Sequence, residues 1–150
     1  MNTYFLDTSA FVKRYHREDG SDVIDNLFAE PDAKFIISDI SIIEFYSAIA
    51  LKVRIGDIQE DDFTILRKRF AQDIKDEVYQ VVEVTKQAKT EAVNLLITYG
   101  KTYSLKTLDA LQLAVMKLGD PHKTQVIVCA DGKFCRIITL DGFRTINPAP

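Results

Sequence analysis

Four acids of this chain stand in apolar segments, which is an uncommon setting for a carboxylate. They are Asp7 after Tyr4–Leu6, Glu44 within Ile40–Tyr46, Asp109 within Leu108–Leu111 and Asp131 after Val126–Ala130. A buried carboxylate is unfavourable unless it is paired, hydrogen-bonded or bound to a metal ion. If the fold gathers all four, their mutual repulsion favours a hard divalent cation, Mg²⁺ or Mn²⁺, with oxygen ligands. Such an ion polarises a phosphoryl group and activates a water molecule for in-line attack.

Each acid also has a purely structural interpretation. Asp7 could cap the turn that begins at Thr8, and Glu44 could close a capping box with Ser41. Asp131 precedes Gly132, a common turn dipeptide. Asp109 is harder to explain in this way, because an acid beside an apolar stripe gains nothing structurally. The joint pattern therefore favours a shared site more strongly than any one acid does.

The elements that must position these acids alternate along the chain. Strands are expected at Thr3–Leu6, Lys34–Ile37, Tyr79–Val84, Gln125–Cys129 and Phe143–Ile146, and helices from Ser21 to Phe28 and at Asp39–Arg54, Glu60–Val78, Thr85–Tyr99 and Lys106–Leu118. This order predicts an α/β fold, a three-layer sandwich with a mostly parallel sheet between helices. Sites in such folds collect outside the carboxyl ends of the strands, where Asp7 and Asp131 stand.

Finer features of these helices follow from residue type and spacing. Ser21 is expected to cap its helix, and Gly56 and Gly100 are expected to end theirs. In the helix from Lys106, the predicted buried stripe is Leu108, Leu111, Val115 and Leu118.

Length and composition restrict the class of protein. The chain has 150 residues, 47% of them hydrophobic and 27% charged, which predicts one globular domain over residues 1–150. No apolar run approaches the ~18 residues of a membrane span, and no basic residue precedes Asp7 as a secretory signal requires. Cys129 and Cys135 are too few for a disulfide framework. We expect a cytoplasmic protein without membrane contact and with reduced thiols.

The charge balance bears on the substrate. The net charge of −3 disfavours a plain nucleic-acid binder. The four acids account for four negative charges, so the remainder carries +1 and a metal-loaded form would not strongly repel a polyanion. Lys13 and Arg14 closely follow Asp7 and are expected to face a phosphate chain beside the site.

Several segments resemble the PIN domain family, and specifically its VapC-type toxin ribonucleases. The segments that carry the resemblance are Tyr4–Tyr15, Ser38–Glu44, Leu108–Val115, Ala130–Phe134 and Gly142–Pro148. The resemblance implies a parallel sheet between helices and an Mg²⁺- or Mn²⁺-dependent endoribonuclease. It also implies a homodimer that a small antitoxin, encoded beside it, inhibits.

The family's site residues carry over onto matching positions. Asp7, Glu44 and Asp109 match the three core acids, Asp131 matches the fourth, and Ser9 matches a small hydroxyl residue near the first acid. The chain departs from the family at two places. Many relatives have a hydroxyl residue at the position of Cys129 and His at the position of Gln112, so the support of the acids and the choice of substrate stay open.

The leading hypothesis is a metal-dependent endoribonuclease, the toxin of a type II toxin–antitoxin pair, which hydrolyses RNA phosphodiesters with a metal-activated water. An alternative is a non-catalytic PIN-type nucleic-acid-binding module, which the intact acids disfavour. A haloacid-dehalogenase-type phosphohydrolase also places Asp after its first strand, but Asp7-Thr8-Ser9 lacks the second acid of that family's pattern.

Aromatic residues near the acids suggest two partner surfaces. An antitoxin is expected to offer Arg or Lys to the acids and to cover a groove near Phe11, Tyr15 and Tyr46, with Lys13 and Arg14 at its rim. A homodimer is expected from apolar faces that one side of the sheet cannot absorb. The residues of those faces are Phe45, Tyr46, Ile49, Phe63 and Phe70.

Overall fold

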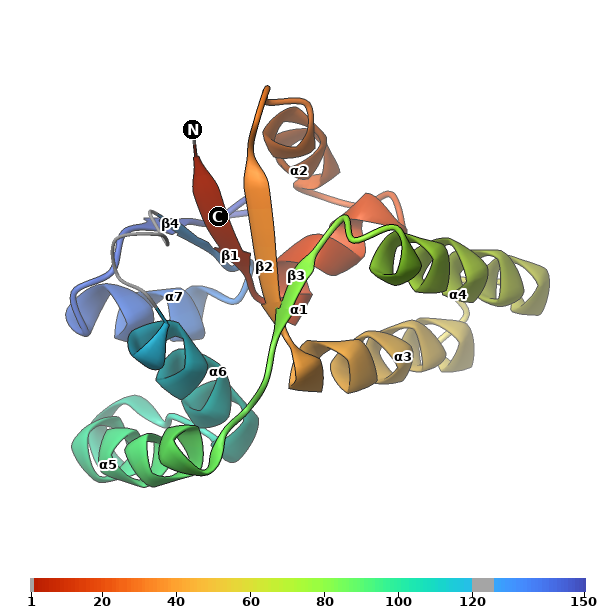
Figure 1. Cartoon of the computed structure of the whole chain (residues 1–150). Coiled ribbons are helices and arrows are strands. Elements are labelled where there is room, and N and C mark those ends of the chain that lie inside the picture. Colours follow the sequence, from red (N-terminus) through yellow and green to blue (C-terminus); the bar gives the residue numbers. More distant parts are fainter. Residues whose placement is uncertain (1, 120–125) are drawn as a thin grey trace.

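A five-stranded sheet forms the middle layer of the fold, and helices cover both of its faces (Figure 1). The computed structural model describes residues 2–119 and 126–150. The strands are β1 (Thr3–Leu6), β2 (Lys34–Ser38), β3 (Gln80–Val82), β4 (Val126–Val128) and β5 (Thr145–Ile146). Their order is β3-β2-β1-β4-β5, and all four pairings are parallel. The α/β sandwich predicted from the sequence is confirmed, with a sheet that is wholly parallel.

The helices follow the strands as the alternating pattern requires. They are α1 (Thr8–Phe11), α2 (Ser21–Phe28), α3 (Asp39–Arg54), α4 (Glu60–Lys75), α5 (Lys86–Tyr103), α6 (Thr107–Leu118) and α7 (Gly132–Leu140), and a 3₁₀ turn covers Val12–Arg14. None of the helices in the described parts of the chain is long and apolar enough to cross a membrane.

The central strand β1 separates two hydrophobic cores. Successive side chains of a strand point to opposite faces, so Tyr4 and Leu6 lie in one core and Phe5 in the other. Phe5 pairs with Ile36 of β2 and Ile127 of β4, and all three belong to the second core. Helices α1 to α4 complete the first core, and α5 to α7 complete the second. This arrangement leaves the carboxyl edge of β1 between the two helical layers.

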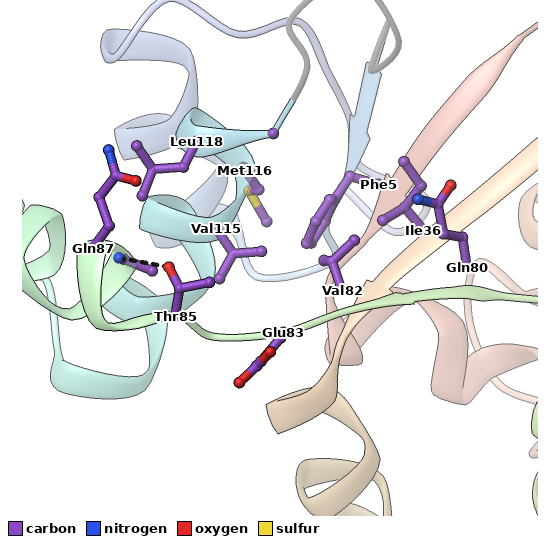
Figure 2. Close-up of a pocket in the computed structure, with 12 residues that line it drawn as sticks. Phe5, Ile36, Gln80, Val82, Glu83, Thr85, Gln87, Val115, Met116 and Leu118 are labelled. Carbon is purple, nitrogen blue, oxygen red and sulfur yellow. Dashed lines mark hydrogen bonds between the residues drawn. The ribbon is translucent and has the colours of Figure 1, made fainter.

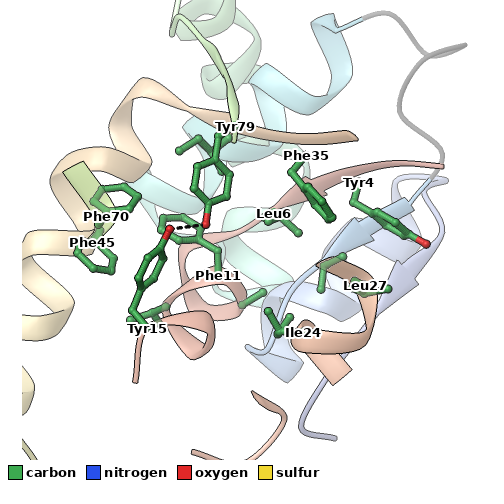
Figure 3. Packing of buried hydrophobic residues seen from close by; sticks show 14 of the residues in the cluster. Tyr4, Leu6, Phe11, Tyr15, Ile24, Leu27, Phe35, Phe45, Phe70 and Tyr79 are labelled. Atoms are coloured by element: carbon green, nitrogen blue, oxygen red, sulfur yellow. Dashed lines mark hydrogen bonds between the residues drawn. The ribbon is translucent and has the colours of Figure 1, made fainter. Parts of the chain in front are cut away.

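The first core contains a cluster of aromatic rings (Figure 3). Phe11 stacks on Phe45 and Phe70, with ring centroids 6.0 and 5.6 Å apart. Tyr15 meets the same two rings edge-on and shares a 2.7 Å hydrogen bond with the hydroxyl of Tyr79. The predicted groove near Phe11, Tyr15 and Tyr46 is therefore wrong for the first two residues, which are buried in this core, whereas Tyr46 is 37% exposed.

The same cluster removes the residue-based reason for a homodimer. Phe45, Ile49 and Phe70 are fully buried where α3 and α4 pack together, and Phe63 packs against them. Most of these apolar faces are covered inside one chain, because α4 packs on α3, and only Tyr46 of the five predicted residues is exposed, at 37%.

The stripe predicted for α6 is confirmed at Val115, which is buried, and at Leu111, which packs against the core, but it is wrong at its two ends. Leu108 and Leu118 are 50% and 41% exposed, whereas Ala110, Leu113 and Ala114 are fully buried. The small alanines permit the close packing of α5 on α6. Leu108 lies in the first turn of the helix, so it faces the carboxyl edge of the sheet.

Other expectations for the helices need local corrections. Helix α5 continues through Gly100 and ends where Ser104 takes a positive φ of 59°. The N-cap of α2 is Gly20, with φ of 88°, and Ser21 instead donates from Oγ to the carbonyl of Lys13. Helix α4 ends at Lys75, and helices α1 and α7 were not predicted. Gln125, the expected start of β4, lies outside the described residues.

Candidate active site

The four acids line one pocket of about 600 Å³ at the carboxyl edge of the sheet. Asp7 directly follows β1, and Asp131 lies shortly after β4. Glu44 comes from the second turn of α3, and Asp109 from the first turn of α6. Residues that are up to 124 positions apart in the sequence thus share a pocket, because parallel strands end at the same edge.

Asp7 is buried and held by the turn that follows it. Its Oδ2 accepts hydrogen bonds from Ser9 N at 3.2 Å and Ser9 Oγ at 2.5 Å. Ser9 Oγ in turn accepts from Ala130 N at 3.0 Å, which joins the ends of β1 and β4. The thiol of Cys129 donates to the same Oδ2 at 3.8 Å, so this departure from the family pattern lies directly against the acid.

Glu44 is held by a buried polar network. Its Oε1 accepts from Thr8 Oγ1 at 3.0 Å and from Gln112 Nε2 at 2.7 Å. Gln112 is 1% exposed, donates also to Ser41 Oγ at 2.7 Å and accepts from Ser38 Oγ at 2.8 Å. The capping-box interpretation of Glu44 is wrong, because Ser38 caps α3 and accepts from Ser41 N.

Asp131 caps a helix rather than a simple turn. Its Oδ1 accepts from Lys133 N at 3.0 Å and Phe134 N at 3.3 Å, so it is the N-cap of α7. The side chain is exposed at the mouth of the pocket. The sequence predicted a turn at Asp131-Gly132, but it did not predict that α7 begins there.

Three of the acids share one pattern. One oxygen of Asp7, Glu44 and Asp131 accepts donors from the chain, and no described residue donates to the other. Asp109 accepts no side-chain hydrogen bond from the described residues. Each acid therefore retains an oxygen for a hard cation, which suits Mg²⁺ or Mn²⁺. Across residues 2–119 and 126–150, no three acidic, His or Cys side chains are already close enough to hold an ion. An ion would have to draw the carboxylates together.

Burial and mutual repulsion disfavour the charged forms of two acids. Loss of solvent raises the pKa of Asp7 to about 6, against the hydrogen bonds from Ser9 and with a contribution from Glu44. Burial, together with the charges of Asp7 and Asp131, raises the pKa of Asp109 to about 7. A divalent ion would reverse both effects, since it favours ionised carboxylates.

The structure places the basic residues differently from the prediction. Lys13 is 9% exposed and paired with Glu18 at 3.1 Å. Arg14 lies 3.4 Å from Asp73 and over the ring of Phe28. Neither lines the pocket. The basis for expecting both to face a phosphate chain beside the site is therefore gone.

Sequence reasoning missed one residue of the site and left another without an assigned contact. Arg54 lines the pocket from the last turn of α3, on the same helical face as Glu44 and Leu51, so helical spacing counted from Glu44 could have identified it. Gln112, noted from the sequence only as a departure from the family pattern, follows Asp109 by three positions in α6, so both point toward one side of the helix.

Figure 2 shows a separate cavity of about 360 Å³ between the sheet and helices α5 and α6. Phe5, Ile36 and Met116 form part of its apolar lining, and Glu83 is the only acid among the described residues that line it. The cavity lacks the grouped carboxylates of the acidic pocket, so the residues predicted to bind a metal ion lie at the carboxyl edge and not here.

The chain is similar to a known family and to several solved structures. The model of the PIN domain family matches residues 4–138. FitAcB from Neisseria gonorrhoeae is 16% identical, with a TM-score of 0.68 and coverage of 97% of each chain. VapC20 from Mycobacterium tuberculosis, described as a sarcin–ricin loop cleaving toxin, is 20% identical, with a TM-score of 0.67 and coverage of 97% of this chain and 99% of its own.

A toxin–antitoxin complex from Klebsiella pneumoniae gives a TM-score of 0.63 at 16% identity, with coverage of 97% of each chain. No curated protein matches the chain by sequence. At these identities the solved structures establish a shared fold.

Substitution of Asp109 by Asn should stabilise the metal-free protein at neutral pH. The folded-state pKa of Asp109 is raised, so its contribution to stability is present below about pH 4 and is lost as the pH rises through about 7. After allowance for solvent around this half-buried group, we expect the melting temperature of Asp109→Asn to exceed the wild-type value by about 2–4 °C at neutral pH in EDTA.

The difference should shrink to nearly zero at about pH 4, where both side chains are neutral. Asp61→Asn is the matched control, because Asp61 is an exposed acid in the first turn of α4. A lower melting temperature for Asp109→Asn than for wild type at neutral pH would contradict this account of the pocket.

Gln112→Leu should remove a hydrogen bond that holds Glu44 without leaving a cavity in the core. The variant keeps the side-chain volume but removes the donor to Glu44 Oε1 and the partners of Ser38 and Ser41. We expect the free energy of unfolding to fall by about 1–3 kcal/mol and the Mn²⁺ affinity to fall by about 10–100-fold. Chemical denaturation and calorimetry measure the two effects. Gln87→Leu, at an exposed Gln beside the other cavity, should change neither, and an unchanged Mn²⁺ affinity in Gln112→Leu would contradict its role.

Proposed function

The chain belongs to the PIN domain family, and from this membership and its acidic pocket we propose that it is a metal-dependent endoribonuclease. We further propose that it is the toxin of a type II toxin–antitoxin system and acts in the cytoplasm. One observation carries the proposal. Four acids from four segments line one pocket; three of them use one oxygen to accept hydrogen bonds, and no residue that the structure describes donates to the other.

The proposed roles follow from this geometry. Asp7, Glu44 and Asp109 would hold the first divalent ion, and Asp131 would complete the site or help to hold a second ion or a water molecule. A bound Mg²⁺ or Mn²⁺ supplies Lewis acidity for a phosphoryl oxygen and lowers the pKa of a water molecule.

The chain's own residues orient the carboxylates for this purpose. Ser9 fixes one oxygen of Asp7, and Thr8 with Gln112 fixes one oxygen of Glu44. All of these donors are neutral, so they position the acids without cancelling the negative charge that attracts an ion.

A small cognate antitoxin is the proposed protein partner. The known toxin–antitoxin complex from Klebsiella pneumoniae shares this fold, which supports a partner of that kind. The acidic pocket continues into an apolar groove on α3, where Ile43 is 71% exposed and Leu51 is 44% exposed. Leu108 of α6 forms its other wall. An antitoxin segment could cover this groove while it offers Arg or Lys to the acids.

We also propose a homodimer, on a surface different from the one first expected. Val93 and Ile97 are 56% and 69% exposed and lie one turn apart on α5. Adjacent exposed apolar residues often mark a partner surface, and two-fold dimers are the commonest assembly. A monomeric mass by light scattering at micromolar concentration would contradict this.

RNA cleavage should depend on Mg²⁺ or Mn²⁺ and stop in EDTA. Asp7→Asn and Asp109→Asn should fold but lose more than about 100-fold in turnover, because an amide is a weaker ligand without charge. Asp61→Asn should retain full activity. Cleavage in EDTA, or unchanged turnover in either pocket variant, would refute the assigned roles. RNA binding without cleavage under every ion would favour the non-catalytic alternative.

Polar substitution of the groove should release the antitoxin but spare the nuclease. The double variant Ile43→Ser with Leu51→Ser should bind the small protein encoded beside the chain at least about tenfold more weakly, since apolar anchors dominate such interfaces. Ribonuclease activity should persist in the variant and escape inhibition. The control is the double variant Ile65→Ser with Leu140→Ser. This isoleucine and this leucine are also exposed, like Ile43 and Leu51, but they lie outside the pocket. Equal binding by both double variants would place the antitoxin elsewhere.

A further inference from the structure

Three exposed cations lie outside the lining of the acidic pocket but close in sequence to Asp109 or Asp131, which line it. Lys106 precedes α6, and Lys133 and Arg136 lie on α7; all three are exposed. We call these three residues the cationic edge. The opposite side of the pocket is the apolar groove of α3, where Arg54 at the far end is the single cation in the lining among the described residues.

Two residues of the cationic edge, Lys133 and Lys106, lie close to acids of the pocket. The backbone of Lys133 donates to Asp131 Oδ1 at 3.0 Å, so its side chain starts at the mouth of the pocket. Lys106 is close enough to Asp109 for its charge to act on that carboxyl. Arg136 follows Lys133 by three positions, so the two side chains share the exposed face of α7.

Arg136 also lies beside an aromatic ring. Its guanidinium carbon is 5.3 Å from the centre of the Tyr103 ring at the end of α5. Arg side chains and aromatic rings are the groups on which RNA-binding proteins stack unpaired bases.

The charges of the cationic edge are not paired with acids of the described residues. Five other cations are engaged in ion pairs, namely Lys13, Arg14, Arg17, Lys52 and Lys117. In the parts of the chain that the structure describes, no carboxylate forms an ion pair with Lys106, Lys133 or Arg136. Three cations that form no ion pair, near a pocket of acids, suit a ligand that carries repeated negative charge.

We propose that the cationic edge binds the phosphates of single-stranded RNA, which runs from the acidic pocket along α7 with one base stacked on the Arg136–Tyr103 pair. This inference rests on the proposed function and specifies how the substrate reaches the site. The strand and the antitoxin then approach from opposite sides, and they compete only at the acids. The edge takes the role that Lys13 and Arg14 cannot fill.

The test compares two matched double variants. The edge variant is Lys133→Ala with Arg136→Ala. The control is Lys68→Ala with Arg67→Ala on α4, where Arg67 lies 5.2 Å from the Phe63 ring and neither residue lines the pocket. Binding of a labelled single-stranded RNA of mixed sequence is measured in EDTA by fluorescence anisotropy over a range of salt concentrations, and cleavage is then measured with Mn²⁺.

The edge variant should bind RNA on the order of tenfold more weakly than wild type. Its salt dependence should be shallower by about 1.4 in the slope of log affinity against log salt, because each phosphate contact in single strands contributes about 0.7. KM should rise with little change in kcat, and affinity for the adjacent antitoxin should stay at the wild-type value. The control should match wild type throughout.

The outcomes separate this inference from the nuclease proposal. Wild-type protein that cleaves RNA, with an edge variant that behaves like the control, overturns the inference and leaves the nuclease intact. Loss of antitoxin binding without loss of RNA binding in the edge variant also overturns it. Wild-type protein that neither binds nor cleaves RNA overturns both.

Discussion

Like charges repel most strongly where water is excluded, and this chain places four carboxylates around one pocket. The parallel sheet imposes that arrangement, because every strand ends at the same edge. This arrangement disfavours the ionised carboxylates, as the raised pKa values of Asp7 (about 6) and Asp109 (about 7) show. The fold tolerates the pocket because two separate cores on either side of β1 stabilise it.

The groups that hold the acids are neutral, so they do not cancel the carboxylate charges. Hydroxyl, amide and backbone N–H groups hold the carboxylates, as with Ser9 on Asp7 and Gln112 on Glu44. Ion pairs such as those of Glu18 with Lys13 and Lys52 join other parts of the chain. A site organised in this way is complementary to a divalent cation, and the cations of its rim remain open to a polyanion.

Most strands of the fold and the four acids of the pocket could be predicted from residue patterns. Short apolar runs predicted the strands. The four acids were identified because each lies within an apolar run or at its end. The pattern did not identify α7, whose apolar residues follow the turn-forming pair Asp131-Gly132. It also misplaced Lys13 and Arg14, because sequence proximity to Asp7 says nothing about the 3₁₀ turn that points them at Glu18 and Asp73.

Long-range partners were beyond sequence reasoning for a physical reason. Gln112 reaches Glu44 across 68 positions, and only the folded chain brings these residues of α6 and α3 within hydrogen-bond distance. From the sequence, the aromatic residues of α3 and α4 exceeded what one side of the sheet could bury. In the fold they bury one another, and this depends on how the two helices cross. Periodicity identifies a buried face but does not say which other face covers it.

The central claim is that the four carboxylates jointly bind one or more divalent ions. Anomalous diffraction from crystals grown with Mn²⁺ tests it most directly. The account predicts a peak inside the pocket, within about 2.2 Å of the open oxygens of at least two of Asp7, Glu44 and Asp109. A crystal saturated with Mn²⁺ that has no peak in this pocket, or a peak bound only by residues outside it, would contradict the account.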